Sequence, residues 1–331
     1  MTYDLLKKLS LTHAVTGDTS LIRTVLREEL SRIGIEPEET GFGSLVFGNT
    51  RNPKKLIVSH CDEVGFQITK IEKNGRLRIL PVGWVFANRL DHAIVYIQTD
   101  NGKVNGVVLH QEILKESNIK DFNSLFLDIG VNTREEAETM GIRPGQTGSF
   151  AKDFFENNGT IISSSLDNKV SQFIVLTLLE QNKEYLDDNM FAFNFDEEME
   201  DHSANGIAFR YKPDLAVILD YCPVHQKWGE GDIMEPSGRG PAVMYRGGSY
   251  ILHEKVRNYF DMKITAPFTK GFISANTLPS LEPQNYENNG HTKAVNVCIP
   301  ALGYHGAAYS VRKSDIESLY NLTKNILETE V

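Results

Sequence analysis

Two stretches of alternating strands and helices enclose a stretch made almost entirely of short strands, and this change of pattern constrains the fold most. Residues 1–65 and 156–331 alternate apolar strand-like runs with amphipathic helix-like runs, which indicates an α/β domain with a mostly parallel sheet flanked by helices. Residues 66–155 alternate short apolar runs with turn residues such as Asn74-Gly75, a pattern typical of a small β-barrel or sandwich. We therefore expect an α/β domain, 1–65 and 156–331, interrupted by an inserted β-barrel domain, 66–155.

The periodicity of apolar residues predicts the individual elements. Within the inserted stretch, the capping box that starts at Thr133 predicts a short helix over 137–140, closed by Gly141. In the flanking stretches we expect helices at 3–10, 19–34, 167–182, 202–211 and 314–329, and strands at 44–48, 55–59, 190–195, 215–219, 263–266 and 294–299.

Charge and cysteine content exclude several classes of protein. The chain carries 34 Lys and Arg against 44 Asp and Glu, a net charge of -10, which disfavours a nucleic-acid partner. No apolar run reaches the ~20 residues that span a bilayer, and the N-terminus lacks the pattern of a signal peptide. Three isolated cysteines argue against a disulfide framework and for a reducing compartment. We expect a cytoplasmic protein with no membrane partner.

A cysteine nucleophile is the first catalytic hypothesis to consider, because His60 precedes Cys61. Adjacent residues of a strand point to opposite faces of the sheet, so His60 is badly placed to act as a base for Cys61. We therefore disfavour a thiol mechanism.

Ligand-type side chains follow or border the predicted strands at several points. Each has an ordinary interpretation: an aspartate before a helix can be an N-cap, an acidic run after a strand can be a solvated loop, and a histidine between glycines can be structural. His60 and Asp62 lie two residues apart, so on an extended chain they share a face. The residues in question are His60, Asp62, Asp167, Glu197, Glu198, Asp220 and His305.

As a group, these residues support a binding site more strongly than any one of them does alone. Parallel strands bring their carboxyl ends to one edge of a sheet, where open α/β sheets bind ligands. Five of these residues are candidate ligands, and their two imidazoles and three carboxylates suit zinc, cobalt or manganese and do not suit a calcium cage. The sequence therefore predicts a metal site at this edge.

The same segments are similar to motifs of the glutamyl aminopeptidase family of metallo-aminopeptidases, which includes the tetrahedral (TET) and FrvX-type proteins. His60-Cys61-Asp62-Glu63-Val64-Gly65-Phe66 resembles the family's His-x-Asp-Glu-Ile-Gly-Phe, and Leu166-Asp167-Asn168-Lys169 resembles its Leu-Asp-Asn-Arg. Glu197-Glu198 matches its Glu-Glu pair, Asp220 its strand-end aspartate and His305 its last histidine. The resemblance covers nearly the whole chain and implies a zinc-exopeptidase-like fold.

Carried over by position, the family implies two divalent metal ions, zinc with cobalt or manganese as alternatives. Asp167 would bridge the two ions. Glu198 and His305 would complete one site, and His60 and Asp220 the other. Asp62 would orient His60, and Glu197 would be the general base. The resemblance also implies peptide substrates with a free N-terminus and homo-oligomers, as dimers or as dodecamers.

The sequence departs from the family's pattern around these ligands. Lys169 replaces an arginine, Glu200 replaces a glycine, and the family's Arg-Tyr-x-His-Ser becomes Leu302-Gly303-Tyr304-His305-Gly306, with Gly303 in place of the tyrosine. These changes are compatible with an enzyme that acts on a narrow set of substrates or on a non-peptide substrate. The rival interpretations are a related dinuclear metallohydrolase, such as a carboxypeptidase or an amide deacylase, a silent metal-binding homologue, and a glycosidase. Adjacent carboxylates seldom face each other across a sugar, which disfavours the glycosidase.

Overall fold

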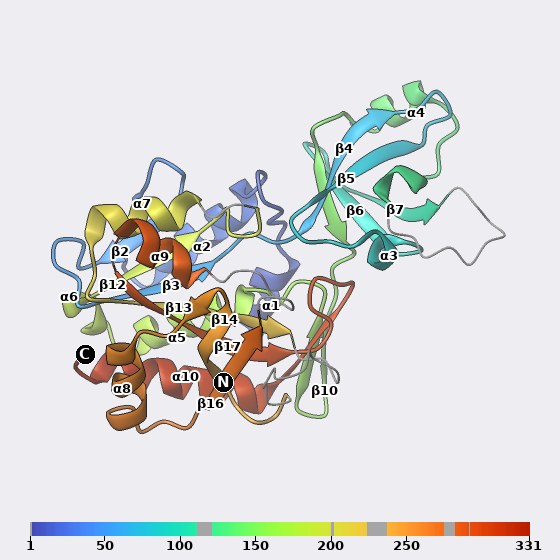
Figure 1. Ribbon diagram of the computed structural model, residues 1–331. Helices are drawn as coiled ribbons and strands as arrows, with labels where there is room; N and C mark the ends of the chain where they lie inside the picture. The colour runs from blue at the N-terminus through green and yellow to red at the C-terminus, as the bar shows by residue number, and fades with distance from the viewer. Residues whose placement is uncertain (1, 111–120, 200–201, 224–236, 275–281, 291) are drawn as a thin grey trace.

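The computed structural model describes residues 2–110, 121–199, 202–223, 237–274, 282–290 and 292–331. It has two parts, an α/β core and a smaller β-barrel that projects from one side of the core (Figure 1). The barrel lies between two stretches of chain that both belong to the core, as the change of pattern along the sequence led us to expect.

A nine-stranded mixed sheet runs through the core. In spatial order its strands are β1 (Glu38–Glu39), β2 (Leu45–Gly48), β12 (Asn189–Asn194), β3 (Lys55–His60), β13 (Leu215–Pro223), β17 (Lys293–Ala301), β14 (Ala242–Gly248) and β15 (Tyr250–Ile251), with β16 (Thr269–Ser274) beside β14. The centre is parallel, because β12, β3, β13 and β17 all run the same way. The pairs β2–β12 and β14–β17 are antiparallel, and β16 runs parallel to β14. The sheet is therefore parallel in the centre, as expected, and mixed toward the edges.

Helices cover both faces of this sheet, because successive residues of the central strands are apolar and point to opposite faces. Ile57 and Val217 pack into a cluster with helices of one face, and Leu56 and Ile218 pack with helices of the other. The first face carries α1 (Asp4–Leu11), α2 (Ser20–Arg32), α5 (Lys169–Gln181), α8 (Glu254–Met262) and α10 (Lys313–Glu328), and the second carries α7 (His202–Tyr211) and α9 (Pro283–Gly290). A short helix, α6 (Tyr185–Asp188), precedes β12.

The barrel closes around its own apolar core, which is a cluster separate from those of the sheet. Its strands, in order around the barrel, are β4 (Gly65–Ile71), β5 (Leu77–Val82), β8 (Leu125–Asp128), β7 (Gly102–His110), β6 (Ile94–Thr99) and β9 (Thr147–Phe150). Its helices are α3 (Ala87–Leu90), η1 (Phe122–Ser124) and α4 (Arg134–Thr139). Thr133 caps α4 by accepting a hydrogen bond from the Glu136 amide at 3.1 Å. The Glu136 side chain accepts from the Asn132 amide at 2.7 Å, not from the Thr133 amide, so the predicted capping box is only half formed. The helix begins earlier than expected.

The two segments that join the core to the barrel are tied together by a buried ion pair. Lys152 Nζ lies 2.7 Å from Glu63 Oε2, and the two side chains are 3% and 5% exposed. Lys152 also donates to the carbonyls of Ser10 and Thr12, and Glu63 accepts from the Ala14 amide. Burial opposes the charge of Glu63, yet Lys152 and neighbouring cations hold its pKa at about 2. Burial lowers the pKa of Lys152 to about 8.

A small antiparallel sheet leads the chain back into the core. It consists of β10 (Phe154–Asn157), β11 (Thr160–Ser163) and β18 (Tyr309–Arg312). Since β11 ends just before Asp167 and β18 begins just after His305, this sheet holds two segments near each other that are far apart in the sequence.

The strand expected at 263–266 is wrong. α8 ends at Met262, and the next strand, β16, starts only at Thr269. The amides of Thr265 and Ala266 donate to the side-chain oxygen of Asn325 at 2.8 and 2.9 Å, so they are not available to a strand ladder. The expected helix at 167–182 begins at Lys169 instead, which leaves Asp167 outside the helix.

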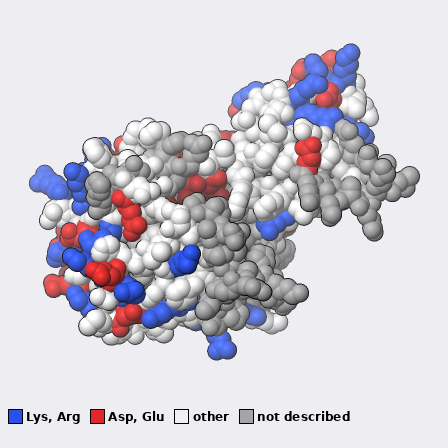
Figure 2. Space-filling view, viewed as in Figure 1, with Lys and Arg blue, Asp and Glu red and all other residues white. Residues whose placement is uncertain are grey.

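Charged side chains are distributed unevenly over the surface. Acidic side chains are visible in the hollow between the core and the barrel, and basic ones gather at the outer end of the barrel (Figure 2). The basic group surrounds a surface cavity lined by Lys70, Lys73, Arg76, Arg78 and Arg134. In the part of the chain that the structure describes, no helix is long and apolar enough to cross a membrane.

Candidate metal centre

The side chains expected at the site meet at one edge of the central sheet. In the parallel register, Asn194 at the end of β12 lies opposite His60 at the end of β3. Glu197 and Glu198 follow β12, and Asp220 lies in the second half of β13. Asp167 precedes α5, and His305 lies in the loop between β17 and β18. β12, β3 and β13 pair in parallel with almost no offset in register, so their carboxyl ends lie at the same edge of the sheet.

One group of possible ligands surrounds His60. Its Nε2 atom lies 3.2 Å from Asp167 Oδ1 and 3.4 Å from Asp220 Oδ1. Glu197 Oε2 is somewhat further away, at 3.9 Å. His60 and Asp167 are almost completely buried, whereas the Glu197 side chain is 24% exposed.

A second group surrounds His305. Its Nε2 atom lies 3.3 Å from Glu198 Oε2 and 3.8 Å from Asp167 Oδ2. The two oxygens of Asp167 thus face two different histidines, Oδ1 toward His60 and Oδ2 toward His305. Glu198 is only 5% exposed, so the two adjacent glutamates differ in their access to solvent.

Asp62 supports both groups. Its Oδ1 atom lies 3.5 Å from Nδ1 of His60, on the side of the ring away from Asp167. Its Oδ2 atom accepts hydrogen bonds from the Thr16 hydroxyl at 2.7 Å and from the Glu198 amide at 3.1 Å. The Glu197 amide donates to Oδ1 at 3.3 Å. One fully buried carboxylate therefore fixes the turn that carries both glutamates.

The protonation behaviour of the cluster reflects an excess of buried negative charge. Burial, with the charges of Glu198 and Asp220, raises the pKa of Glu197 well above its usual value. Burial likewise raises the pKa of Glu198. Burial would lower the pKa of His60, but the surrounding carboxylates raise it well above 6.5. The pKa of His305 is also raised, against the effect of burial, by Glu198.

These residues fit divalent cations. Buried carboxylates without a compensating positive charge are costly, and here five buried or half-buried carboxylates surround two imidazoles. His60 with Asp167 and Asp220, and Asp167 with Glu198 and His305, each offer three ligand atoms within 4.8 Å of one another. The mixture of imidazole nitrogen and carboxylate oxygen suits zinc, cobalt or manganese.

Several contributors to the site carried no signal that the sequence could reveal. The backbone carbonyl of Trp84, in the barrel, accepts a hydrogen bond from Nδ1 of His305 at 3.1 Å. Because Nδ1 carries the proton in this bond, the lone pair of the neutral His305 ring lies on Nε2, which faces Glu198 and Asp167. The Tyr309 hydroxyl accepts from the His305 amide at 2.9 Å and reaches Asp167 Oδ2 at 3.4 Å. A carbonyl has no sequence signature, and a single tyrosine is too common to be one.

Two of the three departures from the family's pattern have a visible structural setting. Lys169 is completely buried, and its ammonium donates to the Cys61 carbonyl. Gly303 has a φ of +85°, and a Cβ there would lie 1.8 Å from the Ala308 carbonyl oxygen, so a larger residue would require a different loop. Glu200 lies outside the described residues.

The cysteines take no part in the centre. Cys61 is buried, its thiol pKa is raised by burial, and Nε2 of its neighbour His60 faces Asp167 instead. The disfavoured thiol mechanism finds no support in this geometry. Cys61, Cys222 and Cys298 are all buried and form no disulfide.

Comparison with known proteins gives one family. The model of the M42 glutamyl aminopeptidase family matches residues 43–322. Lysyl aminopeptidase of Pyrococcus furiosus is 26% identical over 343 residues, covering 98% of this chain and 96% of the relative. The solved structure of aminopeptidase APDkam598 from the archaeon Desulfurococcus kamchatkensis has a TM-score of 0.86 at 25% identity, covering 98% of this chain and 94% of that one.

A second solved structure shares the fold at lower identity. The Pyrococcus horikoshii TET1 peptidase, which can assemble into a tetrahedron or a large octahedral shell, has a TM-score of 0.85 at 21% identity, with 98% of each chain covered. The family match spans most of the sequence and includes all seven residues of the candidate centre. This chain therefore belongs to the M42 glutamyl aminopeptidase family.

Proposed function

We propose that this protein is a metal-dependent aminopeptidase that removes N-terminal residues from peptides at a dinuclear centre. The observation that carries the proposal is the position of Asp167, whose two oxygens lie 3.2 Å from Nε2 of His60 and 3.8 Å from Nε2 of His305. A carboxylate between two imidazole groups is suited to bridging two cations. His60 and Asp220 would hold one ion, and Glu198 and His305 the other. Zinc is the metal that we propose.

Two divalent cations, when bound, would polarise the scissile carbonyl and lower the pKa of a water molecule. Glu197 is the proposed general base, because its carboxylate borders the cluster and is more exposed than Glu198. It would take the proton from the attacking water and deliver it to the leaving amine. Asp62 would hold the His60 ring, and the Trp84 carbonyl would hold the His305 ring.

A panel of aminoacyl-p-nitroanilides tests the activity after reconstitution of the stripped protein with zinc, cobalt or manganese. We expect release of p-nitroaniline from substrates with a free amine and none from their N-acetylated counterparts. Cleavage of the N-acetylated compounds, or of peptides from the carboxyl end only, would favour the amide deacylase or the carboxypeptidase instead.

Removal of the metals is expected to lower the melting temperature as well as the activity. A ligand that binds only the folded state stabilises it, by roughly 2.7 kcal/mol for each site when the free metal exceeds Kd a hundredfold. The measurement is thermal unfolding before and after chelation, and after zinc is restored. Asp188→Asn, at an exposed ion pair with Lys54, is the matched control and should respond to the chelator as the wild type does. An unchanged melting temperature after complete removal of the metals would contradict the proposed centre.

We also propose that residues 1–65 and 156–331 form the catalytic domain and that residues 66–155 form an inserted domain for dimerisation or for covering the site. The separate apolar clusters of core and barrel support this division. Leu80, Trp84, Phe86 and Ile94 are exposed on the barrel side, which suits a contact surface. The proposed cellular location is the cytoplasm, in keeping with three cysteines that form no disulfide.

Homo-oligomers, at least dimers, are expected in solution. The assembly of the Pyrococcus horikoshii relative supports this expectation, and so do the exposed apolar side chains of the barrel. Multi-angle light scattering at micromolar concentration and near-neutral pH measures the mass directly. A mass close to the 37.2 kDa of one chain would count against the proposed assembly.

A further inference from the structure

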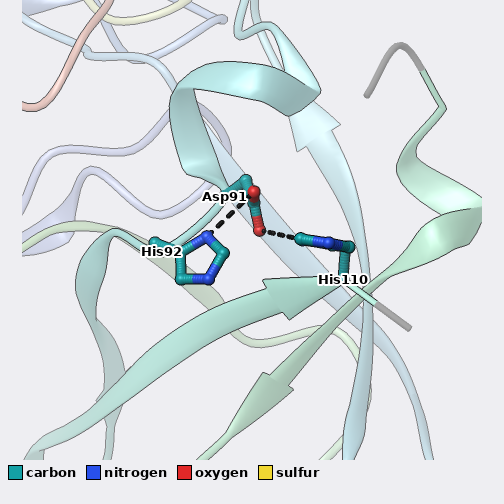
Figure 3. A group of neighbouring side chains, drawn as sticks. All are labelled: Asp91, His92 and His110. Carbon is teal, nitrogen blue, oxygen red and sulfur yellow. Dashed lines mark hydrogen bonds and ion pairs between the residues drawn. The ribbon is translucent and has the colours of Figure 1, made fainter. Parts of the chain in front are cut away.

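A second cluster of metal-ligating side chains lies on the barrel, outside the centre described above. Asp91, His92 and His110 point toward one another (Figure 3). Asp91 Oδ2 lies 2.9 Å from His92 Nδ1, and Asp91 Oδ1 lies 2.9 Å from His110 Nδ1. One ligand atom from each of the three residues lies within 4.8 Å of the other two. The proposed catalytic centre uses none of these residues.

The backbone holds these side chains together across two elements. Asp91 and His92 follow α3 directly, whereas His110 ends β7. The His92 amide donates to the Val108 carbonyl at 2.8 Å, and the Val108 amide donates to Ala93 at 3.1 Å. These bonds fix the turn after α3 against the last residues of β7. Three side chains brought together by fixed backbone need little rearrangement to hold a ligand.

His92 adopts a backbone conformation that few residues other than glycine adopt. Its φ is +59°, in the left-handed region, where histidine is less costly than most side chains but glycine or asparagine would also fit. This conformation turns the imidazole of His92 toward Asp91 and His110 (Figure 3).

We infer that Asp91, His92 and His110 bind a divalent cation of the zinc, cobalt or nickel class. Two imidazoles and one carboxylate are the donors that this class prefers. Each imidazole would carry its proton on Nε2 and direct the lone pair of Nδ1 at the ion. The Asp91 carboxylate, which is hydrogen-bonded to the His110 ring and lies 2.9 Å from Nδ1 of His92, would supply the third ligand. The side chain of His92 is 65% exposed and that of His110 is 17% exposed, so water can complete the coordination.

An ion at this position would connect the turn after α3 to the end of β7. The same short helix reaches the core, because the Arg89 guanidinium donates to the carbonyl of Tyr304, the residue before His305. The site would thus stabilise the segment that also carries the Trp84 carbonyl.

Metal stoichiometry tests this inference on the full-length protein. The stripped wild type is dialysed against graded concentrations of free zinc, and bound metal is measured by elemental analysis. His110→Gln and His92→Asn each remove one imidazole, and asparagine tolerates the positive φ at position 92. His253→Asn is the control, because it removes an exposed imidazole outside the cluster and asparagine can replace it as the N-cap of α8.

We expect both cluster variants to bind one zinc ion fewer per chain than the wild type, and the control to bind as many as the wild type. Circular dichroism confirms that the variants are folded. Equal zinc content in all four proteins at every free zinc concentration would overturn the inference and leave a cluster held only by hydrogen bonds. Failure of the catalytic centre would instead lower the zinc content of all four proteins alike, so the two outcomes are distinguishable.

Discussion

Glu197→Gln is expected to reduce kcat by about 10²–10⁴ while the protein keeps its full metal content. Loss of a general base typically costs that much. The amide retains the shape of the side chain but cannot accept a proton, so the effect falls mainly on kcat. The Glu197 carboxylate lies 3.9 Å from His60 Nε2, further than Asp167 or Asp220, which is why we expect the metals to remain.

Glu198→Gln provides the matched comparison, because it is the same substitution at the neighbouring residue. Glu198 lies 3.3 Å from His305 Nε2 and is nearly buried. A neutral amide is a poorer ligand than a carboxylate for such cations, so this variant is expected to lose metal. The measurements are metal content and kcat for both variants. If Glu197→Gln loses metal and Glu198→Gln keeps it, the two roles are reversed; full activity of Glu197→Gln would refute the proposed mechanism.

Glu63→Gln is expected to lower the free energy of unfolding by about 3–5 kcal/mol at pH 7, because it leaves Lys152 buried without its partner charge. Lys152 can avoid that situation only by losing its proton, which at pH 7 costs roughly 4–5 kcal/mol relative to a lysine in the unfolded chain. Urea unfolding at equal metal loading measures the difference. Glu156→Gln removes a carboxylate that pairs with Lys313 at 2.6 Å but is 45% exposed, and it should cost less than about 1 kcal/mol.

The Glu63→Gln deficit should depend on pH in a defined direction. The pKa of Lys152 is already lowered to about 8 by burial, against the effect of Glu63. Without Glu63 it falls further, so from below pH 8 upward the unfolded variant binds more protons than the folded one, and its stability rises with pH. The deficit relative to wild type should therefore narrow from pH 7 to a little above pH 8 and then level off, because at higher pH the folded wild type has lost the Lys152 proton as well. A deficit that widens in this range, or one no larger than that of Glu156→Gln, would show that the ion pair contributes little.

The sequence was sufficient for those features that depend on local pattern. Continuous apolar runs such as Lys55–Ser59 predicted the central strands, and the ligand-type residues after such runs were expected to lie together at one edge of the sheet. There the structure places one oxygen of Asp167 3.2 Å and one oxygen of Asp220 3.4 Å from Nε2 of His60. The strand predicted at 263–266 does not form, because two amides of that segment donate hydrogen bonds to the side chain of Asn325, about sixty residues away.

Features that depend on pairing between distant segments could not be predicted. Asp91 and His92 approach His110 only because the turn after α3 hydrogen-bonds to β7. No local sequence pattern indicates which residues of the turn pair with which residues of β7. The mixed edges of the sheet have the same origin, since β14 and β17 have no local feature that sets their relative direction. Tertiary pairing, and not local propensity, decides both.

The hydrogen bond from His305 to the Trp84 carbonyl has an evolutionary consequence. Every residue type supplies a carbonyl, so the side chain at position 84 can drift without disturbing this bond. An insertion or deletion between β5 and α3 would move the carbonyl itself and tilt the histidine. Among relatives, the length of this segment should therefore vary less than its amino acids do, and exchange of whole barrels by recombination should succeed only between chains that share that length.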